Sequence, residues 1–193
     1  MVVVWAFAAS ATADETTGDA AVFIRTLGDN VFRVLSTTNT DENDRKQRYR
    51  QLLENGFAVK TIARFVLGRY WRAATPEQQQ EYMVLFRDFV LETYASRLNN
   101  YSGGTFDIVD VQPLDKRDTI VATEIHSPNG PPIRVEYRVR ARGKGYKIID
   151  VLVEGVSLIA TQRSEFASII TRSGIEGLLA LLRERAGHTT AAN

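Results

Sequence analysis

Apolar residues recur every three to four positions over the first hundred residues, a spacing that predicts helices. The first three helices are expected over residues 22–35, 41–53 and 62–71. A longer helix follows, with an apolar and aromatic face that continues to Tyr101. Thr75 and Gln78 have the spacing of a capping box around Pro76, so this helix should begin at residue 76.

The period then changes from 3.6 to 2, which predicts strands. The clearest alternation runs over residues 133–142, where apolar side chains exchange places with arginines and a glutamate. Four strands are expected, over residues 105–114, 118–126, 133–142 and 146–153. Because short turns join them in sequence, we expect an antiparallel meander with one apolar face.

Helical spacing returns after Gly155, and Gly174 predicts a stop before a second helix start. Helices, a meander and further helices define an α+β fold, with a four-stranded antiparallel meander packed against N-terminal and C-terminal helices. Residues 14–186 are interpreted as one domain, followed by a frayed tail over residues 187–193.

The composition and net charge mainly exclude certain kinds of site and partner. The chain has 193 residues, 44% of them hydrophobic, and no cysteine. This is typical of one globular domain, and it rules out disulfides, zinc–thiolate sites and thiol catalysis. The formal net charge is +1, which argues against a bulk electrostatic interaction with nucleic acid.

Residues 1–13 are largely apolar, end in Ala11-Thr-Ala13 and precede Asp14 and Glu15. This pattern is typical of a secretory signal peptide, although the usual basic start is missing. We therefore expect export and cleavage after Ala13. The alternative interpretation is a short hydrophobic element of a cytoplasmic protein.

The chain shows no nucleophile-elbow, phosphate-loop or metalloprotease motif. His126 is expected in a solvated loop. A buried strand aspartate could act as a general base in a small pocketed enzyme. The candidates for that role are Asp107, Asp110, Asp118 and Asp150. We expect no enzyme, no cofactor and no metal, and the small enzyme is the alternative.

Two segments could present a local positive surface: the arginine-rich strand 134–142 and the helix 41–54. Each would attract anionic lipid head groups or an acidic partner. The alternative interpretation of both is a solvated polar face, which on the strand would also discourage edge pairing.

Three apolar surfaces are expected to face one another: the apolar side of the sheet, the helix over 57–71 and the apolar and aromatic stripe of the long helix over 82–101. Core packing alone would explain the stripe. If the surfaces pack imperfectly, the fold is built around a deep apolar cavity.

Several segments carry a family resemblance. They are Leu67-Gly-Arg-Tyr-Trp-Arg-Ala-Ala-Thr-Pro-Glu77, residues 86–94 with Tyr101, Pro128-Asn-Gly130, Val151-Leu-Val-Glu-Gly-Val-Ser-Leu158, and Arg163-Ser-Glu-Phe166 with Gly174. In this order they resemble the MlaC-like (toluene-tolerance, Ttg2-type) auxiliary proteins of lipid-transport ABC systems. One segment departs: the family commonly has Trp-Lys-Val-Tyr-Asp-Val, and this chain has Tyr146-Lys-Ile-Ile-Asp-Val151. The departure affects a pocket position, so the hopanoid-associated HpnM relatives are kept as an alternative.

The resemblance implies a periplasmic carrier with no catalysis and no metal. Such a carrier takes phospholipid between an outer-membrane lipoprotein–porin complex and an inner-membrane ABC transporter with an MCE-domain ring, and so maintains outer-membrane lipid asymmetry. A third hypothesis is a non-catalytic adaptor that only bridges envelope proteins and has a filled core.

Periodicity selects the side chains that should contact lipid. These candidates are Leu67, Tyr70, Phe86, Phe89, Val90, Tyr94, Leu98, Val135, Tyr137, Val139, Ile148, Val153, Val156 and Phe166. Gly155 is expected to permit a sharp bend, held by hydrogen bonds of Glu154 and Ser157.

Overall fold

The computed structural model describes residues 11–37, 41–98, 101–128, 130–143 and 145–187. The helices are α1 (Ala11–Ser36), α2 (Glu42–Gly56), α3 (Val59–Leu67), α4 (Tyr70–Ala73), α5 (Pro76–Leu98) and α6 (Leu158–Gly187). The strands are β1 (Thr105–Pro113), β2 (Asp118–His126), β3 (Ile133–Arg142), β4 (Gly145–Val153) and β5 (Val156–Ser157). The predicted α+β class is confirmed, and the short β5 adds a fifth strand to the predicted four.

Two predicted segments fall wholly or partly outside the described residues. These are most of the signal segment 1–13 and residues 188–193 of the tail; α1 begins at Ala11. No helix in the described ranges is both long enough and apolar enough to cross a membrane.

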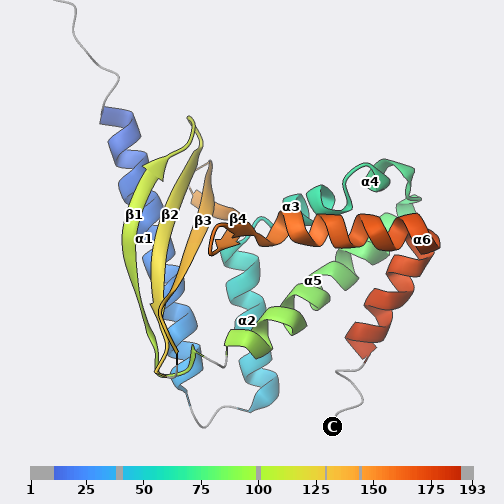
Figure 1. Ribbon diagram of the computed structural model, residues 1–193, viewed down its shortest axis with the longest axis horizontal. Helices are drawn as coiled ribbons and strands as arrows, with labels where there is room; N and C mark the ends of the chain where they lie inside the picture. Colours follow the sequence, from blue (N-terminus) through green and yellow to red (C-terminus); the bar gives the residue numbers. More distant parts are fainter. Residues whose placement is uncertain (1–10, 38–40, 99–100, 129, 144, 188–193) are drawn as a thin grey trace, which may run out of the picture.

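The five strands form an antiparallel sheet in the order β1-β2-β3-β4-β5, as expected for a meander. One face carries Val121, Val139 and Ile148, which are buried against Ala20 and Ile24 of α1. Figure 1 shows α1 lying along this face of the sheet. The first helix therefore covers part of the apolar face that the alternation predicted.

The opposite face of the sheet is polar and largely neutralised. Asp118 is fully buried and accepts hydrogen bonds from Arg138 Nε at 2.8 Å and Arg140 Nε at 2.6 Å. The bonds from Arg140 and Arg138 hold the pKa of this carboxyl below its ordinary value, although burial acts in the opposite direction. Arg134 binds Glu136 at 2.9 Å. The arginine-rich strand thus has its own counter-charges.

A second core is made only of helices. Phe166 of α6 meets the rings of Tyr82, Phe86 and Phe89 of α5, with centroids 5.7 to 6.4 Å apart. Leu178 is fully buried in the same cluster. The aromatic stripe of α5 therefore packs mainly against α6, and only part of it is left for a cavity.

Local signals set the helix boundaries. Thr75 and Gln78 exchange both capping-box bonds at 2.9 and 3.3 Å, and α5 begins at Pro76 as predicted. Gly174 has φ 70° and ψ 179°, so α6 breaks there, as the sequence predicted, and its second half turns sharply (Figure 1).

The predicted bend after β4 is confirmed. Glu154 and Gly155 have φ values of 49° and 78°, as a tight two-residue hairpin requires. The Glu154 carboxylate accepts a hydrogen bond from the Arg134 backbone N–H at 2.7 Å. Ser157 accepts one from the Ala160 N–H at 3.0 Å, which caps α6. The bend thereby places the first turn of α6 beside the sheet.

Candidate functional site

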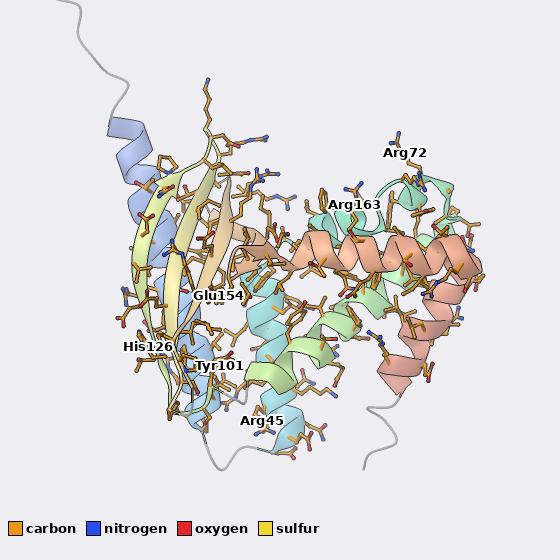
Figure 2. All side chains as sticks on the ribbon, in the orientation of Figure 1. Arg45, Arg72, Tyr101, His126, Glu154 and Arg163 are labelled. Carbon is orange, nitrogen blue, oxygen red and sulfur yellow. The ribbon has the colours of Figure 1, made fainter. Side chains whose placement is uncertain are left out.

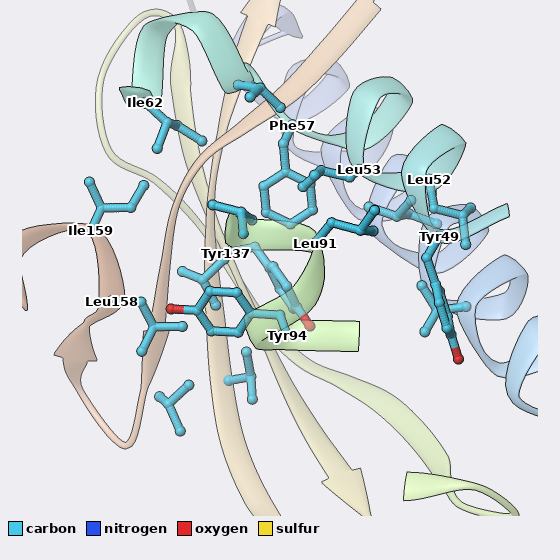
Figure 3. A pocket seen from close by; sticks show the side chains of 18 of the residues that line it. Tyr49, Leu52, Leu53, Phe57, Ile62, Leu91, Tyr94, Tyr137, Leu158 and Ile159 are labelled. Atoms are coloured by element: carbon cyan, nitrogen blue, oxygen red, sulfur yellow. The ribbon is translucent and has the colours of Figure 1, made fainter. Parts of the chain in front are cut away.

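A cavity of about 470 Å³ lies between the sheet and the helices (Figure 3). This volume is within the range of about 300–1,000 Å³ that is usual for small-molecule sites. Its walls are aliphatic and aromatic side chains, four tyrosines, Gly28 and Gln162. Among the residues that the structure describes, no charged side chain lines it. The site can therefore accept an apolar group but offers no counter-ion.

Helices α1 and α2 supply much of this wall. From α1, Leu27, Val31 and Leu35 lie one helical turn apart and all face the cavity. From α2, Leu52 and Leu53 line it. The remaining α1 and α2 lining residues are Ile24, Gly28, Phe32 and Tyr49. Our candidate list missed both helices; the four-residue spacing in α1 is the signal that could have found its share.

Seven of the predicted residues line the cavity. They are Phe86, Phe89, Val90 and Tyr94 of α5, and Val135, Tyr137 and Val153 of the sheet. Val135 and Tyr137 share a face of β3 because alternate residues of a strand point the same way. Figure 3 shows Tyr94 of α5 and Tyr137 of β3 among the side chains that line the cavity.

Four candidates lie in the protein core instead of the cavity wall. Leu67 and Phe166 are 2% and 1% exposed within the helical core between α3, α5 and α6. Val139 and Ile148 are buried beneath α1. Val139 follows Tyr137 on the same face of β3, so periodicity selected the correct face, but α1 covers this end of it.

The last three candidates lie elsewhere. Tyr70 is half-buried against the edge of the helical core, and its hydroxyl is 3.2 Å from Thr171 Oγ1. Val156 is 58% exposed because it follows the tight bend between β4 and β5. The side chain of Leu98 lies outside the described residues.

Burial keeps two tyrosines of the wall, Tyr49 and Tyr137, uncharged at neutral pH by raising the pKa of each hydroxyl. Burial raises the pKa of Tyr137 to about 12, although a hydrogen bond with Thr123 acts in the opposite direction. Burial likewise raises the pKa of Tyr49. The Tyr49 hydroxyl is buried and has no hydrogen-bond partner among the residues that the structure describes. These two tyrosines therefore add rings and neutral hydroxyls to the wall, with no charge.

The residues considered for catalysis lie away from the cavity. Asp118 is held by two arginines, and Asp150 accepts a hydrogen bond from Ser157 at 2.7 Å. Asp110 binds Gln112. His126 ends β2, and its Nε2 is 3.7 Å from the exposed Asp107. None of these four aspartates lines the cavity, and the described ranges contain no cluster of potential metal ligands. The four aspartates considered as a general base are therefore not placed to act in this cavity.

The fold and the site define a class of protein: an α+β domain that encloses an uncharged apolar cavity between a meander and its helices. The chain belongs to the MlaC protein family, whose model matches residues 25–184.

Known relatives agree with this assignment. The MlaC binding protein of an intermembrane phospholipid transport system from Haemophilus influenzae is 26% identical over 132 residues, 66% of this chain and 62% of that protein. Toluene tolerance protein ttg2D from Pseudomonas putida is 26% identical over 106 residues, 55% of this chain and 49% of that protein. The match thus spans less than two thirds of each curated relative.

A solved structure matches over more of the chain. It is the phospholipid-binding protein from Ralstonia solanacearum in complex with a phospholipid, with a TM-score of 0.74 and 30% identity. The match covers 88% of this chain and 98% of that one.

Proposed function

We propose that this protein is a periplasmic, non-catalytic carrier that binds phospholipid by its acyl chains and moves it between the two membranes of a Gram-negative envelope. The observation that carries the proposal is the uncharged cavity of about 470 Å³, walled by aliphatic and aromatic side chains. The phospholipid bound by the Ralstonia solanacearum protein supports the same ligand class for this chain.

The chemistry of the wall decides which part of the lipid would be recognised. Each acyl methylene removed from water contributes about 0.8 kcal/mol, so a chain of roughly sixteen carbons gains about 12 kcal/mol. A phosphate needs cations or N–H donors, and the described wall has no charged side chain. The tails would therefore occupy the cavity and the head group would stay outside, with loose head-group selectivity.

A carrier role also suits the energetics of exchange. A lipid leaves a bilayer readily only when the carrier replaces most of the apolar contacts that the tails lose. The lining from α1, α2, α5 and the sheet can surround a tail in this way.

The family suggests the partners. We propose that the carrier exchanges lipid with an inner-membrane ABC transporter that has an MCE-domain ring and with an outer-membrane lipoprotein–porin complex, thereby maintaining outer-membrane lipid asymmetry. The apolar segment before Asp14 supports export to the periplasm.

The test is a transfer assay between donor vesicles that contain a fluorescent phospholipid and unlabelled acceptor vesicles. The proposal predicts protein-dependent transfer that scales with protein concentration. A folded protein that transfers no phospholipid would contradict it, and transfer of hopanoid but not phospholipid would favour the hopanoid alternative. The adaptor hypothesis predicts no transfer of either lipid.

A further inference from the structure

The outer side of α3, α4 and the first half of α6 carries exposed cations with few carboxylates nearby. The cations are Lys60, Arg64, Arg69, Arg72 and Arg163. The sequence from residue 57 to 75 contains no aspartate or glutamate. On the first half of α6 the single carboxylate is Glu165, which binds Gln162. No described residue forms an ion pair with any of the five cations.

Aromatic rings are interleaved with these cations. Phe65 is 51% exposed, and the Arg163 guanidinium lies 4.7 Å from its ring centroid. Two neighbouring arginines stack on half-buried rings: Arg64 is 4.9 Å from Trp71, and Arg69 is 4.9 Å from Tyr70. Stacking orients the guanidinium groups but leaves their charge in place. We call Lys60, Arg64, Phe65, Arg69, Tyr70, Trp71, Arg72 and Arg163 the cationic–aromatic face.

The elements assemble this face on one side of the molecule. Gly68, with φ 59°, ends α3 and brings the chain against α6, so that a Cβ there would lie 3.3 Å from the Arg163 guanidinium. Tyr70 reaches Thr171 of α6. Arg72 and Arg163 both point outward on this side in Figure 2.

Other basic clusters of the protein differ because they have counter-charges. The sheet arginines surround Asp118. On α2, Lys46 binds Glu92 at 2.5 Å and Arg50 contacts Asp88 at 3.3 Å. In these clusters the carboxylates largely cancel the positive potential. The cationic–aromatic face has no such ion pairs with described residues and therefore keeps its positive potential.

We propose that the cationic–aromatic face docks onto a membrane surface rich in anionic phospholipid head groups. Basic side chains near such a surface are attracted to it, and aromatic rings with arginine stems suit the interface between head groups and tails. The charges are spread over a face and form no pocket, which fits a lipid surface better than a single acidic motif. Helix α3 also lines the cavity with Val59, Ile62 and Val66, so docking would bring a cavity wall next to the bilayer.

The test is flotation of the purified protein with vesicles of phosphatidylglycerol and phosphatidylcholine, compared with phosphatidylcholine alone. We expect binding to the anionic vesicles at low salt and its loss at high salt. The variant is Lys60→Gln with Arg72→Gln, because neither side chain has a hydrogen bond, ion pair or stack with a residue in the described part of the chain. Each lost cation should weaken binding about fivefold, and the pair roughly 25-fold.

The control is Arg33→Gln with Arg48→Gln, two exposed arginines of α1 and α2 that carry the same total charge. Its vesicle affinity should change less than threefold. Equal loss in the two double variants, or no binding of the unaltered protein to anionic vesicles, would overturn the proposal. Phospholipid loading, measured by mass spectrometry, should stay normal in both, so failure of docking is distinguishable from failure of the carrier function.

Discussion

A single carboxylate placed in the cavity should prevent lipid binding without unfolding the protein. Val90 of α5 lines the cavity, and Val84 on the same helix is 48% exposed. The substitutions Val90→Asp and Val84→Asp therefore make the same chemical change on one helix, with only the first in the proposed site. Water can hydrate the Val90→Asp carboxylate while the cavity is empty, so we expect this variant to fold.

The size of the effect follows from protonation. An aspartate with an ordinary pKa near 3.9 must be neutralised before acyl chains cover it, which costs about 4 kcal/mol at pH 7. Burial of the neutral carboxyl without a partner adds about 1–3 kcal/mol. The sum of about 5–7 kcal/mol predicts affinity lower by roughly four to five orders of magnitude. At about pH 5 the protonation cost falls to roughly 1.5 kcal/mol, so affinity should recover about a hundredfold.

The assay is displacement of a fluorescent acyl probe by phospholipid at both pH values, with folding checked by circular dichroism. Val84→Asp should bind like the unaltered protein. If folded Val90→Asp binds as well as Val84→Asp at neutral pH, Val90 does not contact the ligand and the cavity argument fails.

The remaining predictions concern stability and core placement. Tyr82→Phe should destabilise the protein by about 1 kcal/mol in urea titrations, because the buried Tyr82 hydroxyl donates to the Ala63 carbonyl at 3.0 Å. Tyr49→Phe should leave stability unchanged or raise it by up to about 1 kcal/mol, since no described residue is a hydrogen-bond partner of its buried hydroxyl; a loss as large as that of Tyr82→Phe would contradict the assignment. The pKa of Asp118 is lowered on folding, so its stabilisation is complete above the ordinary carboxyl pKa and is lost as the pH falls through the folded pKa. Asp118→Asn should therefore lower the free energy of unfolding by about 2 kcal/mol at neutral pH. Below about pH 4 the stability of this variant should fall less than that of the unaltered protein; equal stability of the two proteins at neutral pH would refute this. Val139→Asp should lower the thermal midpoint or prevent folding, because α1 covers Val139 and no water reaches it; a folded Val139→Asp variant with normal stability would show that this assignment is wrong.

Sequence periodicity predicted which way side chains point, and this was enough for the class of fold. Alternation on β3 placed Val135, Tyr137 and Val139 on one face, which the structure confirms. It could not distinguish the part that faces the cavity from the part beneath α1. That difference depends on where a helix over a hundred residues earlier in the chain crosses the sheet.

The helical candidates show the same limit. Phe86 and Phe89 touch both the helical core and the cavity, whereas Phe166 belongs to the core alone. The break at Gly174 was readable from the sequence, yet its effect on packing was not. Because α6 turns sharply at Gly174, its second half packs against α5 and buries Leu178 and its neighbours. This long-range contact fills the space around Phe166.

The arginines illustrate how electrostatics depends on tertiary structure. The strand 134–142 is rich in arginine, which indicated a possible positive surface, but the buried Asp118 neutralises the centre of the strand. Four of the five cations of the cationic–aromatic face come from residues 57–75, a segment without a carboxylate. The packing of α3 on α6 at Gly68 then adds Arg163 to them, and no pattern in the sequence shows this contact.

The most direct test of the central claim is mass spectrometry of the lipid that co-purifies with the protein from a Gram-negative envelope. The proposed carrier function predicts diacyl phospholipid bound to the unaltered protein and none bound to Val90→Asp. Repeated preparations of folded protein that contain no lipid, or a cavity loaded equally in both proteins, would contradict it.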